Sequence, residues 1–286
     1  MIELIPEGYW LVFAALTGAV LGSFASVVIH RLPIMMEREW LQEHQAFSGE
    51  ETREPSVSRY DLSFPGSSCP HCGGRIPPWF NLPLIGFLLL RGRCHACGHA
   101  ISARYPFLEM LGLVMAISAL LCFGPGAEAL WAMVLGTFLL ILSFIDLDHR
   151  ILPDRLTLSL LWVGLLLSVF DLFTDSHSSI LGASLGYGLL WTIHALFRLL
   201  ARKEGMGRGD FKLLAALGAW MGVGHLPLIV LISSVVGAMV GVALILLGVR
   251  KREDAIPFGP FLALAGWIAL LAGDRINAQY LSFYTG

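Results

Sequence analysis

The stretch Leu139-Leu140-Ile141-Leu142-Ser143-Phe144-Ile145-Asp146 is an apolar run that ends in a carboxylate. A second junction of this kind is Gly205-Met206-Gly207-Arg208-Gly209-Asp210, a glycine-rich turn that ends in Asp210 just before another apolar run. An ionisable side chain at the margin of a hydrocarbon core is costly, so each aspartate marks a candidate functional site. The apolar runs themselves predict helices that cross a membrane.

The composition agrees with a membrane protein. The chain has 286 residues, of which 56% are hydrophobic and 14% charged, and its mean hydropathy is +0.72. Soluble domains carry about 25% charged residues, so we expect an integral membrane protein surrounded by lipid. The net charge of -2 gives no reason to expect nucleic acid as a partner.

A helix needs about 20 apolar residues to span the hydrocarbon core, and the sequence offers about eight such segments. We predict spans at residues 9–29, 106–123, 127–146, 156–173, 179–199, 211–223, 226–248 and 257–273. The segment 211–223 is the shortest and slightly polar. The predicted fold class is therefore an all-α polytopic membrane protein with about eight transmembrane helices.

The basic residues predict the orientation. With these spans, residues 30–105, 147–155, 200–210 and 249–256 face one side of the membrane. Of the 19 Lys and Arg residues, all but Arg275 lie in or beside these four segments. Basic loops stay in the cytoplasm, so Asp146 and Asp210 are both expected at the cytoplasmic face of a bacterial inner membrane.

The first cytoplasmic segment suggests a division into three parts. We expect a first transmembrane helix at 1–29, a cytoplasmic domain at 30–105 and the main transmembrane domain at 106–286. Within the cytoplasmic domain, Glu37 to Tyr60 is charged and poor in apolar residues, which predicts an exposed or mobile segment. The later part is rich in Pro and Gly, which favours turns over long helices.

Four cysteines of this domain form two Cys-x-x-Cys pairs separated by 21 residues, Cys69 with Cys72 and Cys94 with Cys97. Two such pairs complete a tetrahedral Cys₄ zinc site. The alternatives are a redox pair or a chance spacing, and the cytoplasmic location argues against structural disulfides. Four thiolates leave no open coordination position, so the predicted zinc is structural.

The two aspartates predict the chemistry. Two neighbouring carboxylates can share one proton and activate a water against a peptide bond, as in aspartic proteases. For Asp210 the alternative is a helix N-cap, but a cap does not explain Gly205, Gly207 and Gly209. These glycines allow positive φ and close backbone approach, as a turn that accepts a substrate requires. The sequence thus predicts an aspartic peptidase at the membrane border.

Three aspartates compete for the first catalytic position. Asp154 follows Pro153 and precedes an apolar run, so helix capping is its expected role. Asp148 lies two residues beyond Asp146 and points to another helix face, so we expect only a supporting polar role. Asp146 is embedded deepest in apolar sequence. The predicted catalytic pair is Asp146 and Asp210.

Motifs along nearly the whole chain resemble those of the type IV prepilin peptidase family. They are Gly22-Ser23-Phe24, Val27 to Pro33, Ser68 to Cys72, Asn81 to Leu84, Arg91 to Cys94, Arg104-Tyr105-Pro106, Asp146 to Asp154, Gly205 to Lys212 and Pro257 to Phe261. The chain departs from the common pattern at Ala25-Ser26, where Leu-Asn is frequent, and at Gly86, where Ser is frequent. The Gly-x-Gly-Asp element alone also occurs in presenilin-like proteases.

The resemblance implies a GxGD-type aspartic protease that is also a methyltransferase. Such an enzyme cleaves the leader from prepilins or type II secretion pseudopilins and N-methylates the new N-terminus with S-adenosylmethionine. The family's aspartates map onto Asp146 and Asp210, and its tetracysteine motif onto Cys69, Cys72, Cys94 and Cys97. No sequence pattern locates the methyl-donor site. The competing hypotheses are a presenilin-like intramembrane protease, a transporter, and a non-catalytic zinc scaffold of a secretion machinery.

Overall fold

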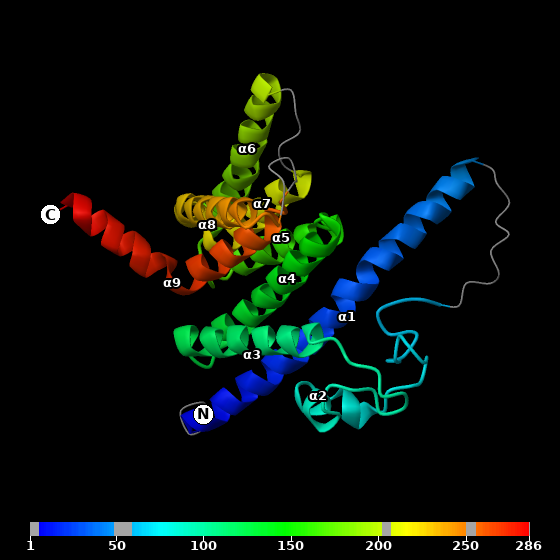
Figure 1. The fold of residues 1–286 in the computed structure, drawn as a ribbon. Coiled ribbons are helices and arrows are strands. Elements are labelled where there is room, and N and C mark those ends of the chain that lie inside the picture. The colour runs from blue at the N-terminus through cyan, green and yellow to red at the C-terminus, as the bar shows by residue number, and fades with distance from the viewer. Residues whose placement is uncertain (1–5, 49–58, 202–206, 250–255, 286) are drawn as a thin grey trace. The chain divides into compact units, whose positions relative to one another are not determined.

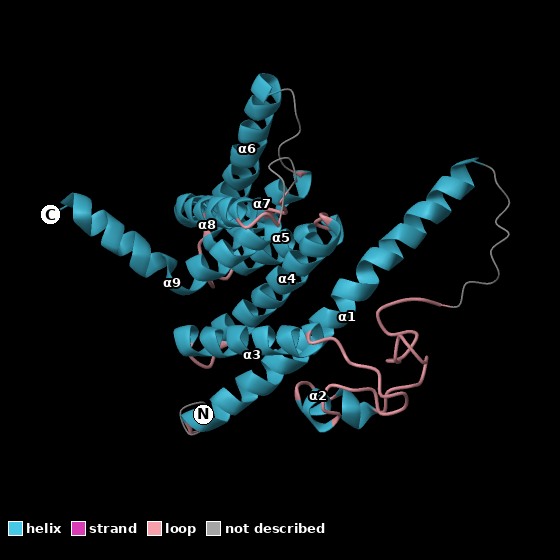
Figure 2. Ribbon diagram, viewed as in Figure 1, coloured by secondary structure: helices cyan, strands magenta, loops and turns pink. Residues whose placement is uncertain are grey.

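The computed structural model describes residues 6–48, 59–201, 207–249 and 256–285. The chain divides into two compact units, residues 1–120 and 121–286. Both units are built of helices and loops (Figure 2), and the described residues contain only two isolated β-bridges and no strand. The predicted all-α class is therefore confirmed.

The first unit contains two long helices and a loop region. Helix α1 spans Glu7–Ser48 and α3 begins at Arg104 and ends at Phe123, just beyond the unit boundary. Between them lie the 3₁₀ helix η2 (Pro78–Asn81) and the five-residue α2 (Ile85–Leu89). The short elements agree with the turns that Pro and Gly predict for this region.

Small residues bring α1 and α3 into close contact. Ala14, Gly18, Gly22 and Ala25 recur at spacings of three and four, so they form one face of α1. A Cβ atom on Gly18 would lie 2.5 Å from the carbonyl oxygen of Gly112, so the two backbones touch at this point. Membrane helices associate through such close backbone contacts.

The segment from Glu37 onward differs from the prediction. Helix α1 continues through Pro33 and ends only at Ser48, so the first part of the expected mobile segment is helical. The reason is that Glu, Arg, Gln and Leu in this segment are strong helix formers. Its side chains are largely exposed, as predicted, and residues 49–58 lie outside the described residues.

The second unit is a bundle that follows the chain from α4 to α9 (Figure 1). Its elements are α4 (Ala127–His149), α5 (Asp154–Ser168), α6 (Ser176–Ala201), α7 (Arg208–Met221), η3 (Val223–His225), α8 (Leu226–Leu246) and α9 (Gly259–Thr285). Helix α7 is the centre of the bundle, because it contacts α5, α6, α8 and α9. Every residue of α7 from Leu213 to Met221 is buried.

Two polar contacts fix α7 among its neighbours. The Trp220 indole Nε1–H donates a 2.8 Å hydrogen bond to the Leu160 carbonyl of α5. The Ser179 hydroxyl of α6 donates a 2.6 Å bond to the Ala219 carbonyl. Since buried polar groups are costly when unpaired, both contacts specify how α7 is oriented.

Helices form at all eight positions where the sequence predicts spans, and six of them are long and apolar enough to cross a membrane. These six are α1, α3, α4, α6, the helical segment that contains α8, and α9. Helices α5 and α7 have 15 and 14 residues, fewer than the roughly 20 that a complete span needs. The chain is thus a multi-pass membrane protein in which the helix that carries Asp210 is short and enclosed by others.

Candidate active site

Asp146 lies in the last turn of α4 and faces the start of α9. Its side chain is buried, with 5% exposed. Its Oδ2 accepts a 3.0 Å hydrogen bond from the backbone N–H of Gly259, the first residue of α9. The N-terminus of a helix presents free N–H groups and a partial positive charge, so this end of α9 suits a carboxylate.

Asp210 lies in the first turn of α7. The N-cap of α7 is Gly207, so Asp210 is the third helical residue and not the cap; the N-cap alternative is wrong. The side chain is 6% exposed. Its Oδ1 is buried and accepts no hydrogen bond from any residue that the structure describes. A buried carboxylate oxygen without a partner is costly, so this oxygen still lacks a hydrogen-bond donor.

The two carboxylates belong to the same site. Asp146 is close enough to Asp210 to act on it electrostatically. Leu152 lies in the connection between α4 and α5. It packs against Gly209, which precedes Asp210, and against Gly259, which binds Asp146. A Cβ on Gly209 would lie 2.6 Å from the Leu152 Cβ, and a Cβ on Gly259 would lie 3.2 Å from its Cδ2. Leu152 therefore leaves no room for a side chain at position 209, whereas at position 259 the nearer obstacle is the Asp146 carboxylate, whose Oδ2 would lie 2.7 Å from an added Cβ.

The glycine-rich turn works differently from the prediction. Gly205 lies outside the described residues, and Gly207 has an ordinary φ of -74°, so it does not use positive φ. Gly209 is helical, and because it has no side chain it allows Leu152 to pack closely against it. Close backbone approach is therefore the feature of this turn that the structure contains.

The neighbouring aspartates have other environments. Asp148 is exposed, beyond the buried part of α4. Asp154 does not cap α5, whose N-cap is Pro153 with no side-chain cap bond; the capping prediction is wrong. Its carboxylate instead forms a 2.5 Å ion pair with Lys212 Nζ. This contact joins the starts of α5 and α7, and the sequence gives no sign of it because the two residues are 58 positions apart.

The four cysteines form a compact cluster in the first unit. The Sγ atoms of Cys69, Cys72, Cys94 and Cys97 all lie within 4.8 Å of one another, and all four thiols are free. The Cys69 and Cys97 sulfurs are 3.9 Å apart. A tetrahedral site with Zn–S distances of about 2.3 Å needs sulfurs about 3.8 Å apart, so the cluster fits a four-coordinate metal ion.

The two cysteine pairs have matching backbone turns. The N–H of Gly73 donates to the Cys69 carbonyl at 2.8 Å, and the N–H of Gly98 donates to the Cys94 carbonyl at 2.9 Å. Both glycines have positive φ, 68° and 71°, which an L side chain disfavours. The backbone N–H groups of Cys72 and His71 lower the pKa of the Cys69 thiol to about 7. This favours the thiolate, the form that binds a metal ion, at Cys69, whereas burial and the neighbouring thiols raise the pKa of Cys97 to about 11.

Comparison with known proteins identifies what the chain resembles. The family model described as "Type IV leader peptidase family" matches residues 133–242, and the "Bacterial Peptidase A24 N-terminal domain" matches residues 16–123. The first match includes both aspartates and the second all four cysteines of the cluster. No solved structure matches the chain.

Relatives of known name match over nearly the full length. A protein of Aeromonas hydrophila is 47% identical over 99% of this chain and 98% of its own length. Proteins of Pseudomonas aeruginosa and Burkholderia pseudomallei are 48% and 46% identical over 94% of this chain, and over 92% and 87% of their own lengths. All three are named prepilin leader peptidase/N-methyltransferase.

Proposed function

This chain belongs to the type IV leader peptidase family, as its motifs predicted, and we propose that it cleaves the leader from prepilins or pseudopilins and N-methylates the new N-terminus. The observation that carries the peptidase part is that Asp146 and Asp210, two buried carboxylates from α4 and α7, lie near enough to interact electrostatically. Two adjacent carboxylates repel when both are ionised, so the pair favours a state with one shared proton.

In the proposed reaction, the ionised carboxylate takes a proton from a water while the protonated one donates its proton to the scissile carbonyl oxygen. The water oxygen bonds to the carbonyl carbon and gives a tetrahedral intermediate. When the C–N bond breaks, the protonated carboxylate gives its proton to the nitrogen of the leaving chain, and the other carboxylate takes a hydroxyl proton from the intermediate, which leaves a new carboxyl group on the leader and returns the pair to one proton. The roles belong to the coupled pair and not to either aspartate alone.

The surroundings of the pair support this chemistry. The N–H of Gly259 fixes Asp146 through Oδ2, so the carboxylate is oriented before the substrate binds. The Oδ1 of Asp210 has no partner among the described residues, so it is the oxygen that would accept a hydrogen bond from the attacking water once the substrate opens the site. Leu152 packs close to Gly209 and Gly259, so it links the two segments that carry the carboxylates.

We further propose a structural zinc and a methyl donor. Cys69, Cys72, Cys94 and Cys97 would hold Zn²⁺ as four thiolates, which leaves no coordination position for a substrate. The zinc would stabilise the cytoplasmic domain, residues 30–105. S-adenosylmethionine would supply the methyl group to the amine that cleavage releases. Residues 106–286 would then form the peptidase domain, with residues 1–29 as the first transmembrane helix.

The proposed location is the bacterial inner membrane, with the aspartates at the cytoplasmic face. The distribution of basic residues supports this orientation. A prepilin whose basic leader remains in the cytoplasm would present its scissile bond at the same face.

One experiment tests the function. The purified protein is incubated in detergent with a prepilin, with and without S-adenosylmethionine, and the products are analysed by mass spectrometry. Loss of the leader followed by the mass of one added methyl group is the expected result. A non-catalytic scaffold or a transporter would leave the prepilin intact, and a presenilin-like protease would cut within the membrane helix.

A further inference from the structure

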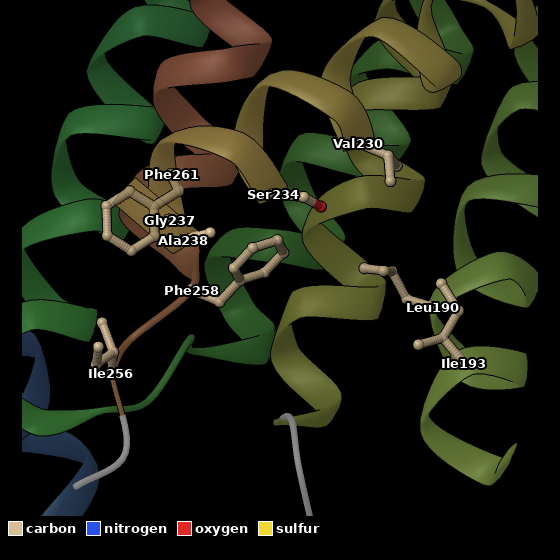
Figure 3. Close-up of a pocket in the computed structure, with 9 residues that line it drawn as sticks. All are labelled: Leu190, Ile193, Val230, Ser234, Gly237, Ala238, Ile256, Phe258 and Phe261. Carbon is tan, nitrogen blue, oxygen red and sulfur yellow. The ribbon is translucent and has the colours of Figure 1, made fainter. Parts of the chain in front are cut away.

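An apolar groove lies between α6 and α8 beside the start of α9. Its volume is about 320 Å³. Leu190 and Ile193 line it from α6, and Phe258 lies between them and Phe261 (Figure 3). Ser234 of α8 adds a hydroxyl, and none of the described side chains that line the groove is charged. A dry cavity of about 150 Å³ holds benzene, so this groove has room for one or two large side chains.

The groove is anchored to the candidate active site by one backbone turn. The Phe258 carbonyl oxygen accepts hydrogen bonds from the N–H groups of Phe261 and Leu262, both at 3.1 Å. Gly259 is the residue directly after Phe258, and its backbone N–H donates a 3.0 Å hydrogen bond to Asp146 Oδ2. The turn that fixes the aromatic wall of the groove therefore also fixes the carboxylate. A ligand in the groove lies next to the residues that hold Asp146.

The helices on both sides of the groove are largely exposed. Helix α6 and the helical segment that contains α8 are the least buried of the six candidate spans, with 17% of the most apolar stretch of each buried. Along α8 the lining runs from Val230 to Ala238. At 1.5 Å per residue this is about 12 Å, or about two helical turns. An apolar helix that arrives within the membrane could lay side chains three or four residues apart along this length.

We propose that this groove binds apolar side chains from the first turns of the substrate's membrane helix, on the C-terminal side of the scissile bond. The proposal rests on the proposed function. The occupant follows from the groove itself, because its uncharged wall excludes a basic leader and its position beside Asp146 requires a segment close to the bond that is cleaved. Ala238 and Ile256 are then residues that determine which helices are accepted.

Cross-linking tests the occupant without any need for turnover. Ala238→Cys is combined with Asp210→Asn and Cys122→Ala, and is mixed with prepilins that carry one cysteine in the first turns of the apolar helix. The matched control is Met239→Cys, since Met239 neighbours Ala238 but is 67% exposed and does not line the groove. A disulfide with Ala238→Cys and none with Met239→Cys is expected. Equal cross-linking of both, or of neither, would overturn the proposal.

Kinetics provide the second measurement. Ala238→Phe fills the groove, so KM should rise about tenfold while kcat changes less than about twofold, because apolar burial contributes to binding and not to chemistry. Met239→Phe should change neither. A substrate with alanines in its first turns should raise KM for the unaltered enzyme but not further for Ala238→Phe. An unchanged KM in Ala238→Phe would mean that the groove merely faces lipid.

These results separate the two proposals. If the unaltered protein cleaves prepilin and neither measurement responds, the groove proposal fails and the function stands. If the unaltered protein cleaves no prepilin, the function fails, and the cross-linking result still decides whether the groove binds the helix.

Discussion

The backbone N–H of Gly259 donates a 3.0 Å hydrogen bond to Oδ2 of Asp146, across 113 residues of sequence. Two helix ends meet in this contact, the last turn of α4 and the first residue of α9. Helices α4 and α9 also pack against each other elsewhere, so the bond is supported by a larger interface. The position of the Asp146 carboxylate thus depends on a residue with no side chain of its own.

Gly259→Ala should therefore reduce cleavage. An added Cβ would lie 2.7 Å from Asp146 Oδ2 and 3.2 Å from the Leu152 Cδ2, so the carboxylate must move. We expect kcat to fall about tenfold or more with little change in KM, because the interaction positions a reacting group. The control is Gly188→Ala in α6, where nothing lies within 4 Å of an added Cβ. Equal rates for both variants would contradict this account.

Asp146→Asn and Asp210→Asn should each abolish leader cleavage, with a loss of about 10³-fold or more. The pair acts as a unit, so the loss of either member removes most of the rate. Cleavage is measured on protein with normal expression and membrane insertion. Substantial activity in either variant would refute the assignment of the catalytic pair.

Asp154→Asn is the matched control for these two variants. It removes a carboxylate at the start of α5 that contacts Lys212, two residues after Asp210. Asp154 is 60% exposed and is paired with Lys212. Exposed pairs contribute less than about 1 kcal/mol, so the variant should fold and cleave normally. A loss of cleavage comparable with that of Asp146→Asn would place Asp154 in the reaction.

The sequence predicted the part of the site that depends on local spacing, because two Cys-x-x-Cys turns predict a cluster of four sulfurs and the four Sγ atoms lie within 4.8 Å of one another. The common membrane face of Asp146 and Asp210 stays a prediction, because α5 and α7 are shorter than a complete span. Contacts between helices could not be predicted, because residues such as Gly259 and Lys212 become neighbours of Asp146 and Asp154 only through packing. The length of α1 was missed because charged residues that favour helix were interpreted as a mobile segment. The catalytic roles stay a prediction.

Zinc should co-purify at about one equivalent per chain, as expected for a Cys₄ site. Cys72→Ser or Cys97→Ser should release it, and residues 65–100 should then exchange amide hydrogens faster, because metal binding supplies folding energy to small domains. Metal analysis and hydrogen exchange are the measurements. Cys122→Ser is the matched control, since Cys122 is a thiol outside the cluster and should leave the metal content unchanged. Protein purified without chelators that contains no metal would count against the site.

The last prediction separates methylation from cleavage. We expect the loop region between Pro65 and Arg104 to contribute most of the S-adenosylmethionine pocket, because it is the largest part of the chain outside the long apolar helices. Changes there should lower methylation more than cleavage. The mass of the processed pilin N-terminus reports both activities in one sample.

Glu109 of α3 offers a test of this idea that leaves every cysteine and both aspartates intact. Its side chain is 8% exposed, and its Oε2 accepts a 2.7 Å hydrogen bond from the N–H of Leu84, directly before α2. Leu84 has a φ of 59°, a conformation that a leucine disfavours, so the bond helps to hold this part of the loop in place.

Glu109→Ala leaves that N–H unpaired and should loosen α2, whereas the amide oxygen of Glu109→Gln can still accept the bond. Methylation should therefore fall at least about fivefold in Glu109→Ala and recover in Glu109→Gln, with cleavage changed less than about twofold, since the lost hydrogen bond contributes about 1 kcal/mol. If both activities fall in the same proportion, the loop does not form the methyl-donor pocket independently of the peptidase site.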